Sequence, residues 1–246
     1  MNFKSYSELP IRITPCPIIE ATVELRFESN IPYDAIYGYI YNEFKNDYSN
    51  FESLPITKIP EELRRQDGNL RFKPYYKADK DNFIFRIGPN VLTLSNTKEY
   101  TGWKSFSYEI RQVLAKFENL KITDKLFRLG IRYINALEEN IFDNITLELL
   151  YHKNKLNNNK NYIRTQFHEA DYNIALMLSN HAELTSGQDK YSGSVVDIDV
   201  SIGNLDISFF DNMGPVIEEA HNREKFLFFN LLNMNFLNTL SPEYGG

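Results

Sequence analysis

The sequence predicts an α+β protein in which a mainly antiparallel sheet carries three principal helices on one face. Apolar and polar residues alternate with period two between Ile19 and Phe27, which is typical of a half-buried strand. Two other segments repeat their apolar residues at helical spacing, and a third places its few polar residues in one thin helical stripe. The connections between the predicted strands are mostly short, which favours antiparallel pairing.

Several segments match the pattern of strands, and turn residues separate some of them. Gly88, Pro89 and Asn90 lie between two such segments and predict a hairpin turn. The predicted strands cover residues 17–28, 70–77, 82–87, 91–96, 125–137, 162–169, 172–183, 195–202 and 205–210. Residues 145–151 fit either a strand or a short helix.

The three predicted helices cover residues 31–48, 102–120 and 213–240. Pro32 suits the first turn of the first helix, and Thr101 suits the N-cap of the second. The second half of the last helix is almost entirely apolar, so it lies either in the core or against a partner; we favour the core. Residues 49–69 are predicted to be irregular, residues 152–161 to form an exposed loop or hairpin tip, and residues 185–193 to form a loop.

The bulk properties of the chain are those of an ordinary globular protein. Its 246 residues, 42% hydrophobic and 24% charged, suit a single domain, 1–246, in which 1–140 and 141–246 could form sub-halves. The net charge of -6 argues against broad nucleic-acid binding. Cys16 is the single cysteine, so no disulfide forms within the chain. We expect a cytoplasmic protein without a membrane span, because no signal core and no long apolar run are present.

Four segments together resemble a known family. They are PIIEATVELRF, RIGPNVLTLSNTKEYTGW, RLGIRYINAL and EEAHNREKF. The chain resembles a sporadically distributed bacterial family of uncharacterised proteins of about this length, and the resemblance spans most of the chain. Its most specific parts are the Y-x-G-W element, Tyr100 to Trp103, and the R-Y-I-N element, Arg132 to Asn135. The resemblance implies no activity, but the patchy distribution is typical of mobile defence or toxin-neutralising genes.

Asp197 and Asp199 form the strongest candidate for a catalytic pair. Two carboxylates at i and i+2 on a strand point to one face, as in metal-dependent phosphoryl-transfer enzymes. Glu20 or Glu24 could add a third carboxylate from another strand. The more ordinary interpretation is a solvated polar face opposite the apolar residues of the same strand, and we favour it.

A second candidate is a network of opposite charges across the polar face of the sheet. Its members are Glu20, Glu24, Arg26, Arg86, Arg128, Arg132, Asp197 and Asp199. An open face would make this network structural, which we favour. An enclosed face would form a small-molecule or peptide-binding module with Arg128 and Arg132 as anion anchors.

No motif fixes a reaction, a metal or a nucleotide cofactor, so we expect neither metal nor cofactor and assign no catalytic residue. The histidines lack metal-binding spacing. The aromatic complement is rich, with 16 Tyr and 18 Phe, and includes Trp103, Tyr100 and the helical tyrosines 33, 37 and 41. The leading hypothesis is a non-catalytic protein–protein binding or assembly component whose partner is another protein or a second copy.

Overall fold

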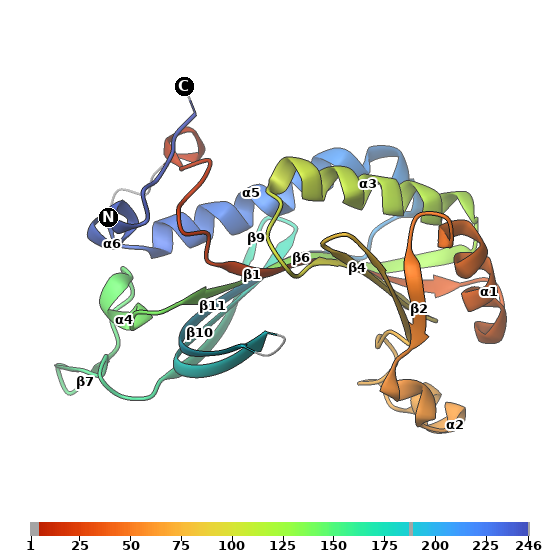
Figure 1. The fold of residues 1–246 in the computed structure, drawn as a ribbon, viewed down its shortest axis with the longest axis horizontal. Coiled ribbons are helices and arrows are strands. Elements are labelled where there is room, and N and C mark those ends of the chain that lie inside the picture. Colours follow the sequence, from red (N-terminus) through yellow and green to blue (C-terminus); the bar gives the residue numbers. More distant parts are fainter. Residues whose placement is uncertain (1–4, 187–188, 246) are drawn as a thin grey trace. The chain divides into compact units, whose positions relative to one another are not determined.

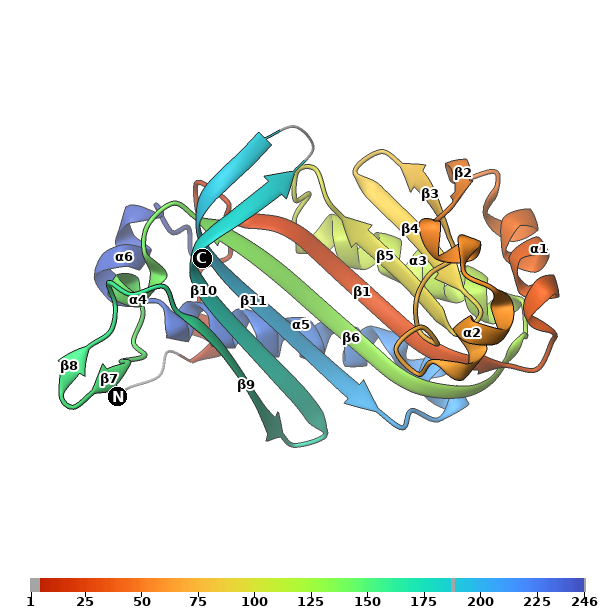
Figure 2. The same cartoon turned by 90° about the horizontal axis from the view of Figure 1, so that it is seen from below.

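The computed structural model describes residues 5–186 and 189–245, and their side chains except those of residue 65 and residues 184–192. Within this part of the chain, nine strands form one sheet in the order β2-β3-β4-β5-β1-β6-β11-β10-β9 (Figures 1 and 2). The pairs β1–β5, β2–β3, β3–β4, β4–β5 and β9–β10 are antiparallel. With its helices, the protein is an α+β fold, which confirms the predicted class.

The strands of the large sheet are β1 Ile18–Ser29, β2 Ser49–Ser53, β3 Tyr76–Lys80, β4 Phe83–Gly88, β5 Val91–Asn96, β6 Thr123–Leu137, β9 Tyr162–Glu169, β10 Tyr172–Ser186 and β11 Asp189–Gly203. A separate small hairpin joins β7 Leu150–Tyr151 to β8 Asn154–Lys155. The α-helices are α1 Tyr33–Phe44, α2 Glu61–Gln66, α3 Trp103–Asn119, α4 Ile141–Asn144, α5 Met213–Leu231 and α6 Met234–Thr239. The 3-10 helices are η1 Tyr6–Glu8, η2 Pro55–Lys58 and η3 Ile207–Asn212.

The chain divides into two compact units. Unit 1 contains residues 1–19, 132–200 and 219–246, and unit 2 contains residues 20–131 and 201–218. The division follows interleaved segments, because the long strands β6 and β11 each contribute to both units. This division into units therefore differs from the two sub-halves, 1–140 and 141–246, that the sequence suggested.

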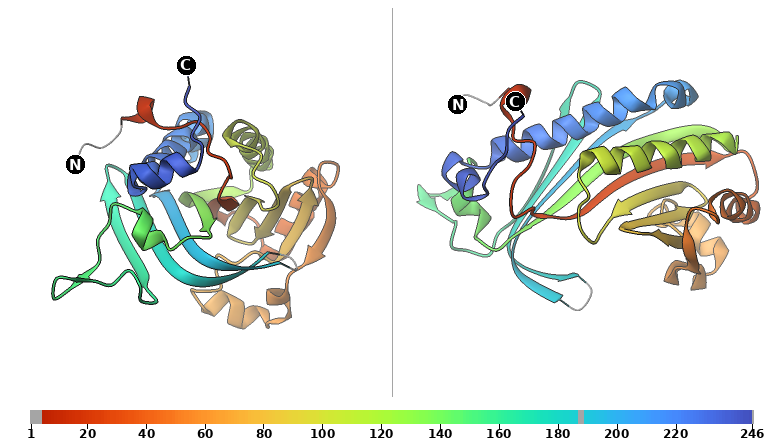
Figure 3. Two further views of the ribbon diagram at one scale, coloured as in Figure 1. Left: turned by 60° about the vertical axis from the view of Figure 1, so that its left-hand side comes forward. Right: turned by 45° about the horizontal axis from the view of Figure 1, so that its top comes forward.

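The core of unit 2 is an aromatic layer between its strands and two helices. Leu25 pairs with Leu92 and Val23 with Leu94, which places their buried side chains on one face. The rings that close this layer are Phe27 against Phe117 of α3, at 4.8 Å, and Phe85 against Phe44 of α1, at 4.6 Å. Both helices therefore cover the same face of these strands, as predicted, and Figure 3 shows α3 lying along them.

The core of unit 1 contains polar groups that are hydrogen-bonded across its elements. The hydroxyl of Tyr133 on β6 lies 3.1 Å from Nδ1 of His221 on α5. The side-chain amide of Asn135 donates to the carbonyl of Val196 at 3.2 Å. All three side chains are buried, so these bonds satisfy groups that would be costly to leave unpaired.

Several predicted boundaries were wrong. Residues 49–69 are not irregular, because β2, η2 and α2 lie there, and β3 starts at Tyr76 instead of residue 70. The segment 205–210 is not a strand, because the 3-10 helix η3 begins at Ile207, where the Asp206 side chain accepts the Ser208 N–H and starts a helical turn. Within residues 152–161, predicted as an exposed loop or hairpin tip, His152 and Lys153 turn the chain between β7 and β8.

Local geometry explains the other boundary corrections. The N-cap of α3 is Gly102 instead of Thr101, because φ there is +85°, a conformation that favours glycine. The last helix is divided at Leu232, because the side chain of Asn233 caps α6 by accepting the N–H of Phe236. Strands β10 and β11 extend into the predicted loop 185–193, of which residues 187–188 lie outside the described residues.

None of the helices within residues 5–186 and 189–245 combines the length and the apolar character that crossing a membrane requires.

The buried pair of titratable groups on α5 predicts the pH dependence of stability. Burial lowers the pKa of His221 to about 3 from 6.5, and burial raises the pKa of Glu224 to about 8 from 4.5. Below pH 6.5 the unfolded histidine gains a proton that the folded one does not, so stability falls toward acid. Above pH 4.5 the unfolded glutamate loses a proton that the folded one keeps, so stability falls toward alkali. Between pH 4.5 and 6.5, each group changes the free energy of unfolding by about 1.4 kcal/mol per pH unit, and the two changes cancel because they have opposite signs.

We therefore expect a stability plateau between pH 4.5 and 6.5 in urea denaturation, with losses on both sides. Glu224→Gln should remove the loss above pH 6.5, and His221→Gln should reduce the loss below pH 4.5. The control is Glu148→Gln, at an exposed glutamate. Identical profiles for Glu224→Gln and the wild type would contradict the assignment.

Candidate functional site

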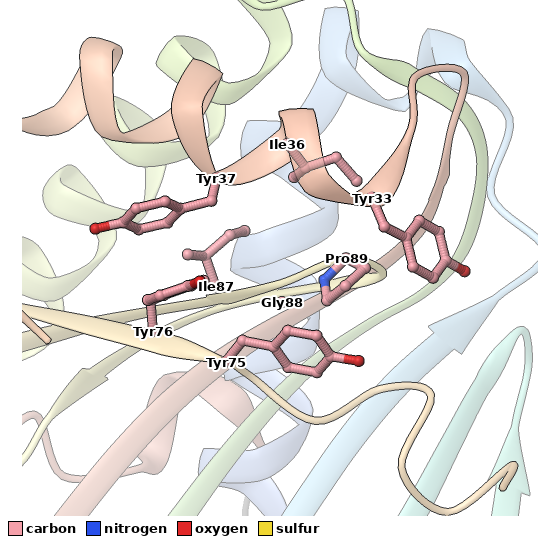
Figure 4. Close-up of a pocket in the computed structure, with 8 residues that line it drawn as sticks. All are labelled: Tyr33, Ile36, Tyr37, Tyr75, Tyr76, Ile87, Gly88 and Pro89. Atoms are coloured by element: carbon pink, nitrogen blue, oxygen red, sulfur yellow. The ribbon is translucent and has the colours of Figure 1, made fainter. Parts of the chain in front are cut away.

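The candidate site is a small, open pocket in unit 2, here called the tyrosine pocket, with a cavity volume of about 20 Å³ inside about 220 Å³ of space that includes open solvent. Helix α1 supplies one wall. The end of the segment before β3, the start of β3 and the β4–β5 turn supply the other (Figure 4). The lining residues are Tyr33, Ile36, Tyr37, Tyr75, Tyr76, Ile87, Gly88 and Pro89. Four of these eight residues are tyrosines, and none is charged.

Buried Asn90 positions the helical wall of the pocket. Its side-chain amide donates to the carbonyl of Phe27 at 3.0 Å, and its backbone carbonyl accepts the N–H of Phe27 at 3.0 Å. Its side-chain oxygen accepts the hydroxyl of Tyr33 at 2.7 Å. One asparagine thus joins β1, the β4–β5 turn and the first turn of α1.

Gly88 allows the opposite wall to approach the turn. A Cβ added at Gly88 would lie 2.4 Å from the backbone oxygen of Lys73, so only glycine fits this contact. The N–H of Tyr75 donates to the carbonyl of Ile87 at 2.7 Å and fixes the segment in place. Tyr75 and Tyr76 therefore reach the pocket because the turn has no side chain at residue 88.

The tyrosines present neutral aromatic faces. Tyr37 and Tyr76 are stacked, with ring centroids 3.8 Å apart, and the Arg64 guanidinium lies 4.3 Å from the ring centre of Tyr75. Burial raises the pKa of Tyr37 and of Tyr75, so their hydroxyls stay protonated and can donate hydrogen bonds. The eight lining residues therefore offer hydroxyl donors and no charge, and the Arg64 guanidinium lies beside the pocket on the ring of Tyr75.

A second hollow in unit 2 is polar, but its charges are paired internally. Both oxygens of Glu109 accept from the ammonium of Lys80, at 2.6 and 2.8 Å, and one also accepts the hydroxyl of Tyr48 at 2.7 Å. Burial and the neighbouring Glu109 hold the pKa of Tyr48 far above its ordinary value. Lys116 bonds to Asp47 at the rim. These contacts neutralise the hollow and make it a weaker candidate.

The predicted charge network is present in part within unit 2. Glu24 accepts from Arg26 and from Arg128, both at 2.7 Å, and Glu20 accepts the hydroxyl of Thr22 at 2.9 Å. Arg128 lies over Gly130, where an added Cβ would fall 2.3 Å from the guanidinium. An anion at Arg128 would have to compete with Glu24.

The other predicted anion anchor and the aspartate pair lie in unit 1. Arg132 makes a bidentate contact with Asp197, at 2.7 and 2.5 Å, and Asp197 is buried. Asp199 also has an interaction partner. In the described part of the chain, no three His, Cys, Asp or Glu side chains are grouped so as to hold a metal ion. The geometry therefore gives Asp197 the role of a charge partner.

Trp103 and Tyr100 pack at the start of α3 in unit 2. The indole N–H of Trp103 donates to both carboxylate oxygens of Glu218, at 3.0 and 2.9 Å. Both rings meet Phe106 edge-on at 6.3 Å. The Y-x-G-W element thus anchors a helix start, which is a structural role for these aromatic residues.

Sequence reasoning included Tyr33 and Tyr37 among the aromatic candidates but missed Tyr75 and Tyr76. The available signal was the pair of adjacent tyrosines after Pro74, just before the strand β3. Successive residues of an extended chain point in opposite directions, so one of two adjacent tyrosines would be expected to leave the core.

No protein-family model matches the chain, and no curated protein matches it either.

The two glycines near the pocket provide a matched pair of substitutions. Gly88→Ala should destabilise the protein by about 1–3 kcal/mol, because the new methyl group would collide with the Lys73 carbonyl. Gly38→Ala, inside α1 with open space around it, should stabilise the protein by about 0.5–1 kcal/mol. Urea denaturation of both variants measures these values. Equal effects would show that the close approach at Gly88 does not exist.

Proposed function

We propose that this protein is a non-catalytic protein–protein binding or assembly component, and that the tyrosine pocket receives an extended segment of another protein. The observation that carries the proposal is the open, uncharged pocket with four tyrosines. Aromatic-lined grooves of this kind bind proline-rich segments in polyproline II conformation. Tyrosine is also enriched among the residues that dominate binding energy at protein interfaces.

The surface around the pocket favours a protein partner over a small metabolite. The aromatic surface of α1 continues beyond the pocket, because Tyr41 lies one turn after Tyr37, with ring centroids 6.0 Å apart, and is 42% exposed. The rings of Tyr41 and of Phe51 on β2 form a T-shaped contact, with 5.1 Å between centroids. A partner segment crossing α1 would therefore meet aromatic side chains beyond the one cavity. A neutral pocket also suits a peptide backbone better than an anionic metabolite.

The two other candidate functions have weaker support. A phosphoryl-transfer enzyme built on Asp197 and Asp199 needs a cluster of ligands, and Asp197 is already bound to Arg132. A binding module with Arg128 and Arg132 as anion anchors needs free guanidinium groups, and both contact carboxylates. Both hypotheses stay predictions.

We place this binding role in the bacterial cytoplasm, in a mobile defence or toxin-neutralising system. This placement rests on the family resemblance and on the single cysteine of the chain.

Selection from a displayed library of random linear peptides tests the proposal. Peptides with proline or aromatic anchors should be enriched on the purified protein. Their affinity, measured by fluorescence polarisation, should fall at least tenfold, or about 1.4 kcal/mol, in Tyr37→Ala and Tyr76→Ala.

The matched control is Tyr39→Ala, which removes a tyrosine of the same helix that does not line the pocket. It should keep most of the affinity. Lack of enrichment, or equal losses in all three variants, would refute the pocket as the binding site.

A further inference from the structure

Strand β9 in unit 1 is an open sheet edge. It is the last strand in the sheet order and pairs with β10 on its other side, and Figure 2 shows it as the outer strand of that hairpin. Tyr162 at its start is 64% exposed, and every side chain of the strand is at least partly exposed. Such an edge presents unpaired backbone groups to which another strand can bind.

The two edges of the sheet differ in how far they resist strand addition. The other edge strand, β2, has five residues, and its register shifts between Ser49 and Glu52. Short and irregular edges of this kind oppose pairing with another chain. Strand β9 has eight residues in uninterrupted register with β10, and it contains neither proline nor glycine. It therefore lacks three common protective features, which are short length, an irregular register and proline.

The hydrogen bonds to β10 fix which residues of β9 have outward-facing backbone groups. The carbonyl of Asn161 accepts the N–H of Asn180, so the backbone of Asn161 points toward β10. Because this orientation alternates along an antiparallel strand, residues 163, 165 and 167 also point toward β10. The outward backbone groups belong to Tyr162, Arg164, Gln166 and His168.

We infer that the β9 edge binds the β9 edge of a second copy of this chain, in an antiparallel pairing with a two-fold axis at Thr165. Two opposed residues exchange backbone hydrogen bonds only if the backbone groups of both face outward, and the outward-facing residues of β9 all have even numbers. The numbers of two opposed residues therefore have an even sum, so the two-fold axis passes through a residue and not between two residues. An axis at Thr165 places Arg164 opposite Gln166 of the second copy, and Tyr162 opposite His168 of the second copy. These pairs exchange backbone hydrogen bonds in both directions.

The side chains favour this register over its neighbours. On the face shared with buried Ile174 and Leu178, Ile163 lies opposite Phe167 of the second copy, a favourable aromatic and β-branched pair. Thr165 faces Thr165 of the second copy, which allows a hydrogen bond. An axis at Arg164 would oppose two arginines, and an axis at Gln166 would place Ile163 against Glu169. Among these three registers, the Thr165 register avoids both conflicts.

Charge substitutions at residue 166 test the pairing and its register together. Gln166→Arg would place two arginines opposite each other, and symmetry repeats the contact, so the dimer dissociation constant should rise roughly tenfold. Gln166→Glu would create two ion pairs at the same positions and should lower the constant. Gln166 is exposed in the single copy, so the fold should tolerate either substitution. Sedimentation velocity of the full chain measures the constants.

A cysteine at the axis provides a geometric test. In a Cys16→Ser background, Thr165→Cys should oxidise to a disulfide-linked dimer, because the two Cα atoms at such a position lie about 4.5 Å apart. Ile163→Cys in the same background should not, because its symmetry mate lies opposite Phe167. A wild type that sediments as a monomer at every concentration would overturn the inference. So would a dimer unchanged by Gln166→Arg, or equal cross-linking at both positions.

Discussion

A buried polar side chain must find hydrogen-bonding partners, and in unit 2 this constraint organises the structure around Asn90. Its three bonds join the backbone of β1 to the β4–β5 turn and to the hydroxyl of Tyr33 on α1. The aromatic layer that includes Phe27, Phe44 and Phe85 buries apolar surface between the strands and the helices, but apolar contacts are not directional. The orientation of α1 against the turn therefore depends on the asparagine. The tyrosine pocket exists because that orientation leaves space beside Gly88.

The pocket and the charged sheet face illustrate opposite uses of polar groups. Glu24 binds two arginines, and Asp197 binds Arg132, so these charges are satisfied within their own units. Such pairs contribute modestly to stability and leave little attraction for a ligand. The pocket tyrosines keep neutral hydroxyls, and the rings of Tyr37 and Tyr76 stack on each other. A chain with a net charge of -6 and an uncharged aromatic pocket is better suited to a peptide than to nucleic acid.

Periodicity predicted the α+β class and most strands correctly, because the alternation in β1 and the helical spacing in α3 follow directly from burial. It failed where single side chains decide the backbone path. Asp206 started a 3-10 turn in a predicted strand, and Asn233 divided the last helix. The pocket was missed because Tyr75 reaches it through the contact of Gly88 with Lys73, which are fifteen residues apart in sequence and leave no local pattern.

The most direct test of the binding role is an NMR titration of the protein with ring-labelled tyrosine, using the tightest peptide from a library selection. The peptide should shift the ring signals of Tyr33, Tyr37, Tyr75 and Tyr76, which line the pocket, and leave exposed Tyr108 on α3 unchanged. Saturation of the four signals at one common affinity would support binding of the peptide in the tyrosine pocket. Shifts confined to tyrosines outside the pocket would contradict it, because binding would then occur elsewhere on the protein.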